Sequence, residues 1–314
     1  MSYLRSPQRA RALDQIATAG GVIAGAAIDH RDSLRAALSR RGLELDDAGV
    51  TDLKLRIAGA LAPEASLVLL DAEYAAAQAV AAGVLPGSTG FAVPLEAMGY
   101  GDVSRLEVTA LLEGWSAAKA RRLGAAAAKL LLPYRVDVPS QAERQEAVVR
   151  AAVADCRAAG LALILEPIVY RRDGEEAAGG HEFARLVVAG AERLAALEPD
   201  VLKVQHPGSA DACRELDEAC GTAIPWVLLG GGASAEAVEA QVEEACRAGA
   251  SGFIVGRTLF DAALVEDAAE SAEILDRECR PLLRRLAEVA ERLGRPWRRR
   301  VGELPRPRHG WYLQ

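Results

Sequence analysis

Short apolar runs alternate with longer amphipathic segments along most of this 314-residue chain. The runs have the length of strands and are nearly continuous, which is the pattern of a parallel sheet buried on both faces. Eight such units over roughly 250 residues predict an α/β fold of the (β/α)8 TIM-barrel type. The expected strands are 21–28, 66–70, 89–93, 126–132, 161–165, 201–204, 226–229 and 252–255.

Segments with helical periodicity separate these runs. They are 32–40, 48–61, 72–82, 115–123, 141–159, 182–197, 209–220 and 235–248, with further helices within 268–293. A doubly wound open sheet is the alternative, but its first loop should read GxGxxG, and here that loop reads Asp29-His30-Arg31. We therefore expect no nucleotide cofactor, and one domain with its barrel at 20–265 and C-terminal helices and tail at 266–314.

The charge balance and the cysteines restrict the possible partners. The net charge of −7 disfavours nucleic acid as a partner. No apolar run is long enough for a bilayer, and the N-terminus lacks the apolar region of a signal peptide. Five scattered cysteines without a CxxC pair are typical of reduced thiols in a cytoplasm. They are Cys156, Cys213, Cys220, Cys246 and Cys279.

The C-terminal tail, residues 295–314, interleaves arginines with Trp297, Trp311 and Tyr312. Such interleaving can bind single-stranded nucleic acid. On an acidic chain, however, we expect the tail to pack on its own barrel or on a partner subunit. We expect a homo-oligomer with no membrane partner.

Lysine is scarce in this sequence. Lys and Arg total 37, yet lysine occupies only positions 54, 119, 129 and 203. Arginine cannot deprotonate in a protein, whereas a buried lysine can become a neutral nucleophile. The lysines that remain in an arginine-rich chain are therefore enriched in sites that need an amine. Lys129 and Lys203 fit this interpretation best, because both lie inside apolar runs.

The active site of a TIM barrel lies at the C-terminal ends of its strands. Interior layers come from alternate strands, so Lys129 on the fourth strand and Lys203 on the sixth can share a layer, with Glu166 between them. Burial and a neighbouring cation both lower a lysine pKa, which favours Schiff-base chemistry. A buried Lys–Glu–Lys salt bridge without a catalytic role is the alternative.

Glycine-rich loops follow the last two predicted strands. Gly230, Gly231 and Gly232 follow the seventh strand, and Gly256 with Arg257 follows the eighth. TIM barrels often bind phosphate at these two loops, through backbone N–H groups and an arginine. The alternative is that the glycines only allow tight turns with positive φ.

These residues resemble the class I tagatose-1,6-bisphosphate aldolase family and the related sulfofructosephosphate aldolases. The resemblance covers about residues 20–264. Its motifs are Ala-Ile-Asp29-His30-Arg31, Thr51-Asp52-Leu-Lys54, Leu69-Leu70-Asp71, Ala128-Lys129-Leu-Leu, Leu165-Glu166-Pro167, Leu202-Lys203-Val-Gln205 and Gly256-Arg257. Two positions depart from the family pattern: His30 stands where Gln is common, and Gln205 where Glu is common. Lys54 matches the family but falls in a predicted helix, and the sequence assigns it no role.

The resemblance implies that Lys203 forms the Schiff base and that Glu166 serves in acid–base chemistry, with Asp29 binding sugar hydroxyls or sharing the base role. It also implies a substrate site that includes Arg31, Lys129 and Arg257. Together with the loop argument, the expected substrate-binding residues are Arg31, Lys129, Gln205, Gly231, Gly232, Gly256 and Arg257.

The implied reaction is the cleavage of a ketose 1,6-bisphosphate such as tagatose 1,6-bisphosphate. Its products would be dihydroxyacetone phosphate and an aldehyde, and it would need no cofactor and no metal. A sulfosugar phosphate, cleaved to dihydroxyacetone phosphate and sulfolactaldehyde, is the first alternative. A non-catalytic barrel that binds sugar phosphates is the second. A metal-dependent lyase or isomerase would need histidine and carboxylate ligands, and the chain has four histidines, of which only His30 and His206 fall at strand ends.

Overall fold

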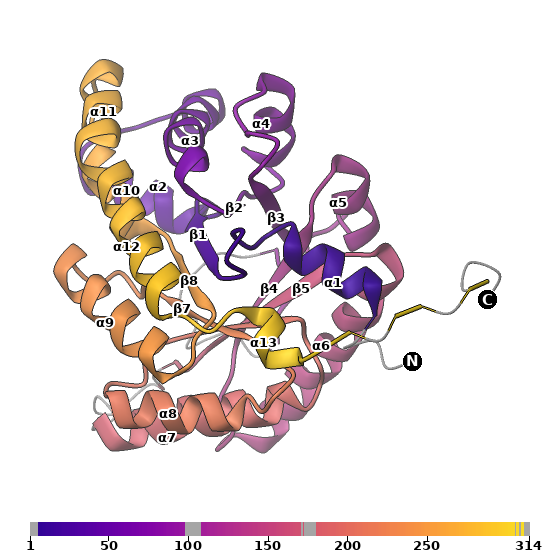
Figure 1. Ribbon diagram of the computed structural model, residues 1–314. Coiled ribbons are helices and arrows are strands. Elements are labelled where there is room, and N and C mark those ends of the chain that lie inside the picture. The colour runs from indigo at the N-terminus through magenta and orange to yellow at the C-terminus, as the bar shows by residue number, and fades with distance from the viewer. Residues whose placement is uncertain are drawn as a thin grey trace.

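Eight parallel strands close into a barrel in chain order, as the sequence predicts, and helices surround it (Figure 1). The computed structural model describes residues 6–97, 108–170, 172, 180–304, 306–307 and 309–310. The strands are β1 (Ile23–Ala27), β2 (Leu67–Leu69), β3 (Gly90–Pro94), β4 (Ala127–Pro133), β5 (Ala162–Ile168), β6 (Val201–Val204), β7 (Trp226–Leu229) and β8 (Gly252–Val255). The (β/α)8 fold class is therefore confirmed.

The helices lie mainly outside the strands. The outer ring comprises α2 (Asp32–Ser39), α3 (Asp47–Leu61), α4 (Ala76–Ala82), α5 (Ala117–Leu123), α6 (Pro139–Ala159), α7 (Gly180–Ala195), α8 (Ala210–Ala219) and α9 (Ala235–Ala248). The chain adds α1 (Pro7–Asp14) before β1, and α10 (Arg257–Phe260), α11 (Ala268–Ile274), α12 (Arg280–Leu293) and α13 (Trp297–Val301) after β8. Short turns η2 (Ala62–Glu64) and η4 (Asp261–Ala263) and the π-helical η5 (Leu275–Cys279) complete the described elements.

Several elements differ from the sequence prediction. Strand β5 continues through Glu166 to Ile168, whereas the prediction ended it at residue 165. Strand β3 includes Pro94, which the prediction placed outside. Proline is tolerated at a strand end, and a charge is tolerated inside a strand when buried partners satisfy it. Helices α1, α10 and α13 were not predicted.

Side chains along the strands alternate between two cores. Inward positions such as Ile164, Val201 and Val227 belong to an inner cluster, whereas their neighbours Leu163, Leu165 and Leu202 pack against the surrounding helices in a larger outer cluster. This alternation follows from the two-residue period of a strand. It also fixes the faces of the charged residues, because Glu166 lies two residues beyond Ile164 and Lys203 two beyond Val201.

Helices α1 and α13 cover the N-terminal end of the barrel and lie in front of it in Figure 1. Leu13, Ile16 and Trp297 are buried there and join the inner cluster. Residues 297–301 of the tail therefore pack on the chain's own barrel, as expected. Trp311 and Tyr312 lie outside the described residues. The polar mouth lies at the other end of the barrel, at the C-terminal ends of the strands.

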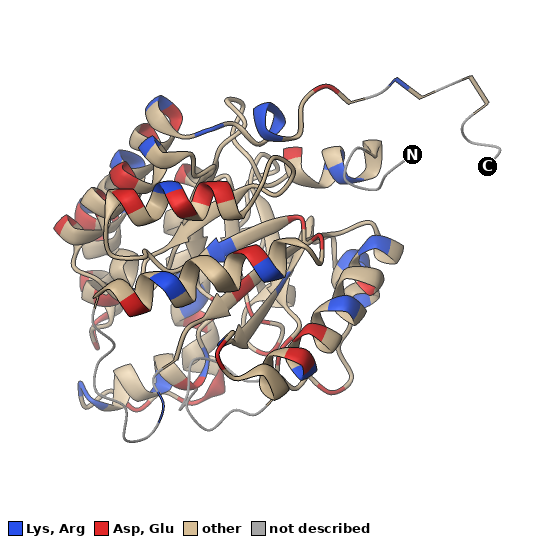
Figure 2. Ribbon diagram, turned by 90° about the horizontal axis from the view of Figure 1, so that it is seen from below, with Lys and Arg blue, Asp and Glu red and all other residues tan. Residues whose placement is uncertain are grey.

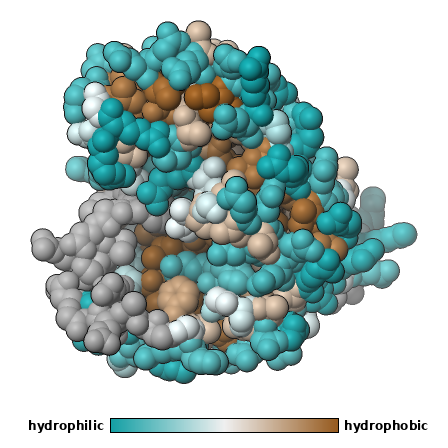
Figure 3. All heavy atoms as spheres, turned by 90° about the vertical axis from the view of Figure 1, so that its left-hand side faces the viewer, coloured by the Kyte–Doolittle hydropathy of each residue, from teal (hydrophilic) through white to brown (hydrophobic). Residues whose placement is uncertain are grey.

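Most acidic and basic residues lie on the helices, with a few on the central strands (Figure 2). Figure 3 shows separate hydrophobic areas within a mostly hydrophilic face. In the described part of the chain, no helix is long and apolar enough to span a membrane. All five cysteines are buried and carry free thiols.

Candidate active site

Three predicted residues meet inside the barrel mouth. Glu166 on β5 pairs with Lys203 on β6 through Oε1 and Nζ, 2.8 Å apart. Its other oxygen, Oε2, lies 3.2 Å from the Nζ of Lys129 on β4. All three side chains are at most 3% exposed. The predicted placement of a carboxylate between two lysines is therefore present.

Two further carboxylates contact Lys129. Its Nζ donates to Asp29 Oδ2 at 2.8 Å and lies 2.6 Å from Glu96 Oε1. Sequence reasoning missed Glu96, because Pro94 was taken to end the third strand. A signal was nevertheless present: Ala92 points inward, so residues 94 and 96 share its inward phase.

The lysines decide the charge state of two of these carboxyls. Burial alone raises the pKa of Glu166 and Asp29, but the nearby ammonium groups outweigh burial and leave both pKa values below their usual range. Burial raises the pKa of Glu96 despite Lys129. Burial also lowers the pKa of His30 to about 4, with Lys203 and Arg257 adding to the effect and Asp29 opposing it. His30 is therefore neutral near pH 7.

A cavity of about 150 Å³ opens beside this cluster. The predicted residues that line it are Glu166, Lys203, Gln205, Gly231, Gly232, Gly256 and Arg257, and His30 lines it as well. Residues from β5 and β6 thus share one cavity with the loops after β7 and β8. Asp29, Arg31 and Lys129 are not among the lining residues.

Two predicted substrate-binding side chains are committed to protein contacts. Arg31 pairs with Glu73 through Nη1 at 2.7 Å and donates from Nη2 to the Glu96 carbonyl at 2.9 Å. Gln205 lines the cavity, but its Oε1 accepts from the Val169 N–H at 2.7 Å. Its amide nitrogen is the end that can donate to a ligand.

The glycine loops combine positive φ angles with close packing. Gly231 and Gly232 have φ values of 57° and 77°, which favour glycine. Gly256 is needed for a different reason: a Cβ there would overlap the His30 ring. The His30 ring in turn meets Phe260 edge to face, with centroids 5.9 Å apart. The loop after β8 and the end of β1 are therefore fitted to one another.

Lys54 and Asp71 form a fully buried ion pair away from the cavity. Asp71 Oδ1 also accepts from the backbone N–H groups of Glu73 and Tyr74, at 3.1 and 2.7 Å. Lys54 therefore anchors the turn that follows β2. The sequence assigned Lys54 no role, and the structure shows a structural role for it.

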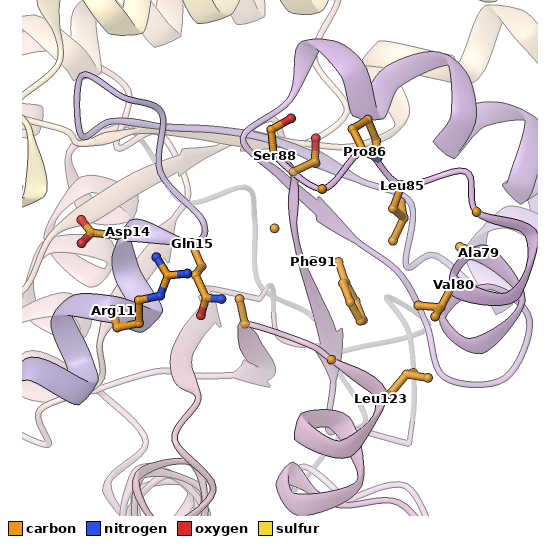
Figure 4. Close-up of a pocket in the computed structure, with 16 residues that line it drawn as sticks. Arg11, Asp14, Gln15, Ala79, Val80, Leu85, Pro86, Ser88, Phe91 and Leu123 are labelled. Carbon is orange, nitrogen blue, oxygen red and sulfur yellow. The ribbon is translucent and has the colours of Figure 1, made fainter.

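A second cavity, of about 450 Å³, lies at the N-terminal end of β3 (Figure 4). Arg11, Asp14 and Gln15 face it from α1 and the turn after it, and Val80 and Leu123 line its opposite side. Catalytic sites of TIM barrels lie at the opposite, C-terminal end of the strands. The smaller cavity, which contains the charged strand residues, is therefore the candidate site.

Comparison with known families agrees with this geometry. The family model described as "DeoC/LacD family aldolase" matches residues 23–262, from the first residue of β1 to the turn after α10. The chain belongs to the DeoC/LacD aldolase family. Every strand of the barrel and every residue of the candidate site falls within the matched part.

The individual relatives share little sequence identity with this chain, but the alignments cover most of both chains. Tagatose 1,6-diphosphate aldolase 1 of Enterococcus faecalis is 28% identical over 296 residues, which cover 85% of this chain and 89% of the relative. Tagatose 1,6-diphosphate aldolase of Streptococcus pneumoniae is also 28% identical, covering 92% of this chain and 97% of the relative. The family resemblance inferred from the motifs is thus confirmed.

Solved structures support the fold of this DeoC/LacD family member. An archaeal fructose-1,6-bisphosphate aldolase, with its catalytic Lys covalently bound to the carbinolamine intermediate, aligns with a TM-score of 0.60 and 18% identity, over 90% of this chain and 99% of the other. Fructose-bisphosphate aldolase of Plasmodium falciparum aligns with a TM-score of 0.67 and 15% identity, over 98% of this chain and 97% of the other.

Among the residues that the structure describes, no group of three or more His, Cys, Asp or Glu side chains is arranged to hold a metal ion.

Proposed function

We propose that this chain is a Schiff-base aldolase that cleaves a ketose 1,6-bisphosphate such as tagatose 1,6-bisphosphate. The products are dihydroxyacetone phosphate and an aldehyde that carries the second phosphate. One observation carries the proposal: Lys203 and Glu166 pair at 2.8 Å on the wall of a cavity at the barrel mouth. The names of the tagatose 1,6-diphosphate aldolases that it resembles support the choice of substrate.

Lys203 is the proposed nucleophile because it lines the cavity. Lys129 is the competing lysine, but it is not among the lining residues and three carboxylates surround its ammonium group. Attack by Lys129 would require its proton to leave a strongly anionic environment, which favours the charged form. We assign Lys129 the role of a fixed cation that supports the substrate site.

The first half of the reaction forms the imine. The Lys203 Nζ attacks the C2 carbonyl of the ketose, and loss of water from the carbinolamine gives a protonated imine. Glu166, 2.8 Å from that nitrogen, transfers the protons of this step. Asp29 contacts Lys129 rather than the cavity, and we propose that it shares the base role through the same cluster.

The second half breaks the carbon–carbon bond. Glu166 takes the proton of the C4 hydroxyl, the C3–C4 bonding pair moves into the imine to give an enamine, and the aldehyde leaves. A proton then returns to C3, and water hydrolyses the imine to release dihydroxyacetone phosphate and Lys203. The low pKa of Glu166 keeps it ionised and ready to accept that proton.

The phosphate next to the reacting carbonyl is the proposed ligand of the glycine loops. Backbone N–H groups of Gly231, Gly232 and Gly256 and the guanidinium of Arg257 bind it. These four residues line the same cavity as Lys203. The Gln205 amide, which lines the cavity, orients the substrate. Arg31 lies outside the cavity and stabilises the site through its contact with the Glu96 carbonyl.

The deciding experiment traps the imine. Dihydroxyacetone phosphate with borohydride should give a stable secondary amine, and mass spectrometry should place it on Lys203. Lys203→Arg keeps the charge but cannot form the imine, so turnover should be lost while the protein still folds. Lys119→Arg, on the outer helix α5, is the matched control and should leave turnover unchanged. An adduct on Lys129, or an active Lys203→Arg variant, overturns the assignment.

A sulfosugar phosphate is the second candidate substrate. His30 and Gln205, the two positions that depart from the pattern of the tagatose-bisphosphate aldolases, both line the cavity. The sulfosugar phosphate carries a sulfonate at the end of the chain where the ketose 1,6-bisphosphate carries its second phosphate. Comparison of kcat/KM for tagatose 1,6-bisphosphate and sulfofructose 1-phosphate decides between the two.

A further inference from the structure

Each of the three oxygen atoms of Glu96 contacts a residue in or next to the candidate site. Its Oε1 lies 2.6 Å from Lys129 Nζ, and its Oε2 accepts from the Leu131 N–H at 3.2 Å. Its carbonyl oxygen accepts from Arg31 Nη2 at 2.9 Å. The residue is only 2% exposed and is not among the residues that line the cavity. Any effect of Glu96 on the reaction must therefore pass through a neighbour.

Three successive contacts connect Glu96 to Lys203, through Lys129 and Glu166. An ammonium group has three N–H donors, and Lys129 meets three carboxylates, those of Asp29, Glu96 and Glu166. Glu166 contacts Lys129 with one oxygen and Lys203 with the other. If Glu96 no longer held Lys129, the ammonium would shift toward the two remaining carboxylates, and Glu166 would turn with it.

We propose that Glu96 is a positioning residue that fixes Lys129 and thereby aims the Glu166 carboxylate at Lys203. The inference rests on the proposed function, because it assigns proton transfer to Glu166. Both Glu96 oxygens must accept, since Lys129 and the Leu131 N–H both donate. An ionised carboxylate meets that demand, whereas an amide offers one acceptor and one donor.

The test is Glu96→Gln, which keeps the size of the side chain. The amide places an N–H against either Lys129 or Leu131. We expect borohydride trapping of dihydroxyacetone phosphate on Lys203 to slow about tenfold to a hundredfold, the usual effect of a misplaced catalytic group. The concentration of dihydroxyacetone phosphate that half-saturates trapping should change less than twofold, because Glu96 does not line the cavity. Trapping at the wild-type rate overturns the proposal.

A matched control separates positioning from a general loss of a buried carboxylate. Glu146 on α6 is 5% exposed, accepts from the Tyr134 hydroxyl at 2.7 Å and pairs with Arg193, away from the cavity. Glu146→Gln should trap at the wild-type rate. If Glu146→Gln slows trapping as much as Glu96→Gln does, the effect is structural and the proposal fails.

Glu96→Asp keeps the proposal falsifiable if Glu96→Gln folds poorly, and a double substitution tests the route through Lys129. Glu96→Asp retains the charge but withdraws the carboxylate by one methylene, so it should slow trapping by a smaller factor. In a Lys129→Met background, Glu96→Gln should have no additional effect, because the proposed influence passes through Lys129. Trapping at the wild-type rate in Glu96→Asp contradicts the inference, and so do additive effects of the Glu96→Gln and Lys129→Met substitutions.

The same measurements separate this inference from the proposed function. If the wild-type protein gives no adduct on Lys203, the Schiff-base assignment itself fails. If the wild-type protein gives the adduct and Glu96→Gln gives it equally fast, only the role of Glu96 fails.

Discussion

Individual charged residues at the barrel mouth have different tasks because their surroundings differ. Lys129 and Lys203 contact the same glutamate, yet only Lys203 lines the cavity, and three carboxylates surround Lys129. Lys54 is also buried, but it pairs with Asp71 and anchors a turn. The residue type alone therefore does not assign a role. The neighbouring carboxylates and access to the cavity do.

Arg257→Ala tests the proposed phosphate site. Loss of a charge-assisted, bidentate hydrogen bond should raise KM for a ketose 1,6-bisphosphate by about tenfold to a hundredfold. KM for a ketose 6-phosphate, which lacks the phosphate beside the carbonyl, should change little. Steady-state kinetics with both substrates provides the measurement, and Arg214→Ala on the exposed face of α8 is the control. An equal rise in KM for both substrates would show that Arg257 does not bind the phosphate beside the carbonyl.

His30 should make stability depend on pH. Its pKa is about 4 in the folded protein against about 6.5 in the unfolded chain, so between these values the unfolded state binds more protons. The contribution of neutral His30 to the free energy of unfolding is complete above pH 6.5. It is lost as the pH falls toward 4, by about 3 kcal/mol in total. Denaturant titrations should show a smaller loss over this window in His30→Gln. An identical loss in both proteins would contradict the buried, neutral histidine.

At the scale of elements, strand ends carry the site and terminal helices close the other end. Strand β5 runs past Glu166 because the two lysines satisfy its charge. Helix α1 is held at the N-terminal end by Arg9, which is 1% exposed and donates from Nε to Asp200 Oδ1 at 2.7 Å. Asp200 also accepts from the Leu163 N–H at 2.8 Å. This helix is thus tied to the starts of β5 and β6.

Arg9→Met should weaken the fold without touching the mouth. It leaves Asp200 buried without its charge partner, which costs about 3–5 kcal/mol of unfolding free energy. Arg9→Met with Asp200→Asn should recover part of that loss, because the Asn oxygen still accepts from Leu163. Arg11→Met, an exposed change on the same helix, should stay within about 0.5 kcal/mol. Chemical denaturation measures all three, and a loss below that of Arg11→Met would contradict the role of α1.

At the scale of the whole molecule, helices cover one end of the barrel and the candidate site lies at the other. Helices α1 and α13 pack on the inner cluster at the N-terminal end, and the charged cluster occupies the C-terminal end. The cavity of about 450 Å³ in Figure 4 lies at the covered end, away from every proposed catalytic residue. Cavity size is therefore a poor guide to the site here, whereas the position of charged strand residues is a good one.

Removal of metal ions tests the reaction class of the whole enzyme. In the proposed mechanism the protonated imine is the electron sink, a task that a divalent cation performs in metal-dependent enzymes. Treatment with excess EDTA followed by gel filtration should therefore leave kcat within about twofold. Loss of activity on chelation, with recovery when Zn²⁺ or Mg²⁺ is added, would place the chain in the metal-dependent class.

The sequence alone determined the barrel and most of its site. Continuous apolar strands and intervening amphipathic helices admit few architectures, so all eight strands were predicted near their observed positions. Because interior layers of a TIM barrel come from alternate strands, the sequence then predicted that Lys129 and Lys203 share a layer with Glu166 between them. These features depend on local pattern, which a single sequence displays directly.

Only the tertiary structure decided which groups meet. Glu96 lies 33 positions before Lys129 and beyond a proline, and nothing local shows that its carboxylate contacts that lysine. The commitment of Arg31 to Glu73, and the burial of α1 and Trp297 under the barrel, likewise join residues distant in the chain. Such contacts depend on the closure of the barrel, which brings strand ends together in space regardless of their separation in sequence.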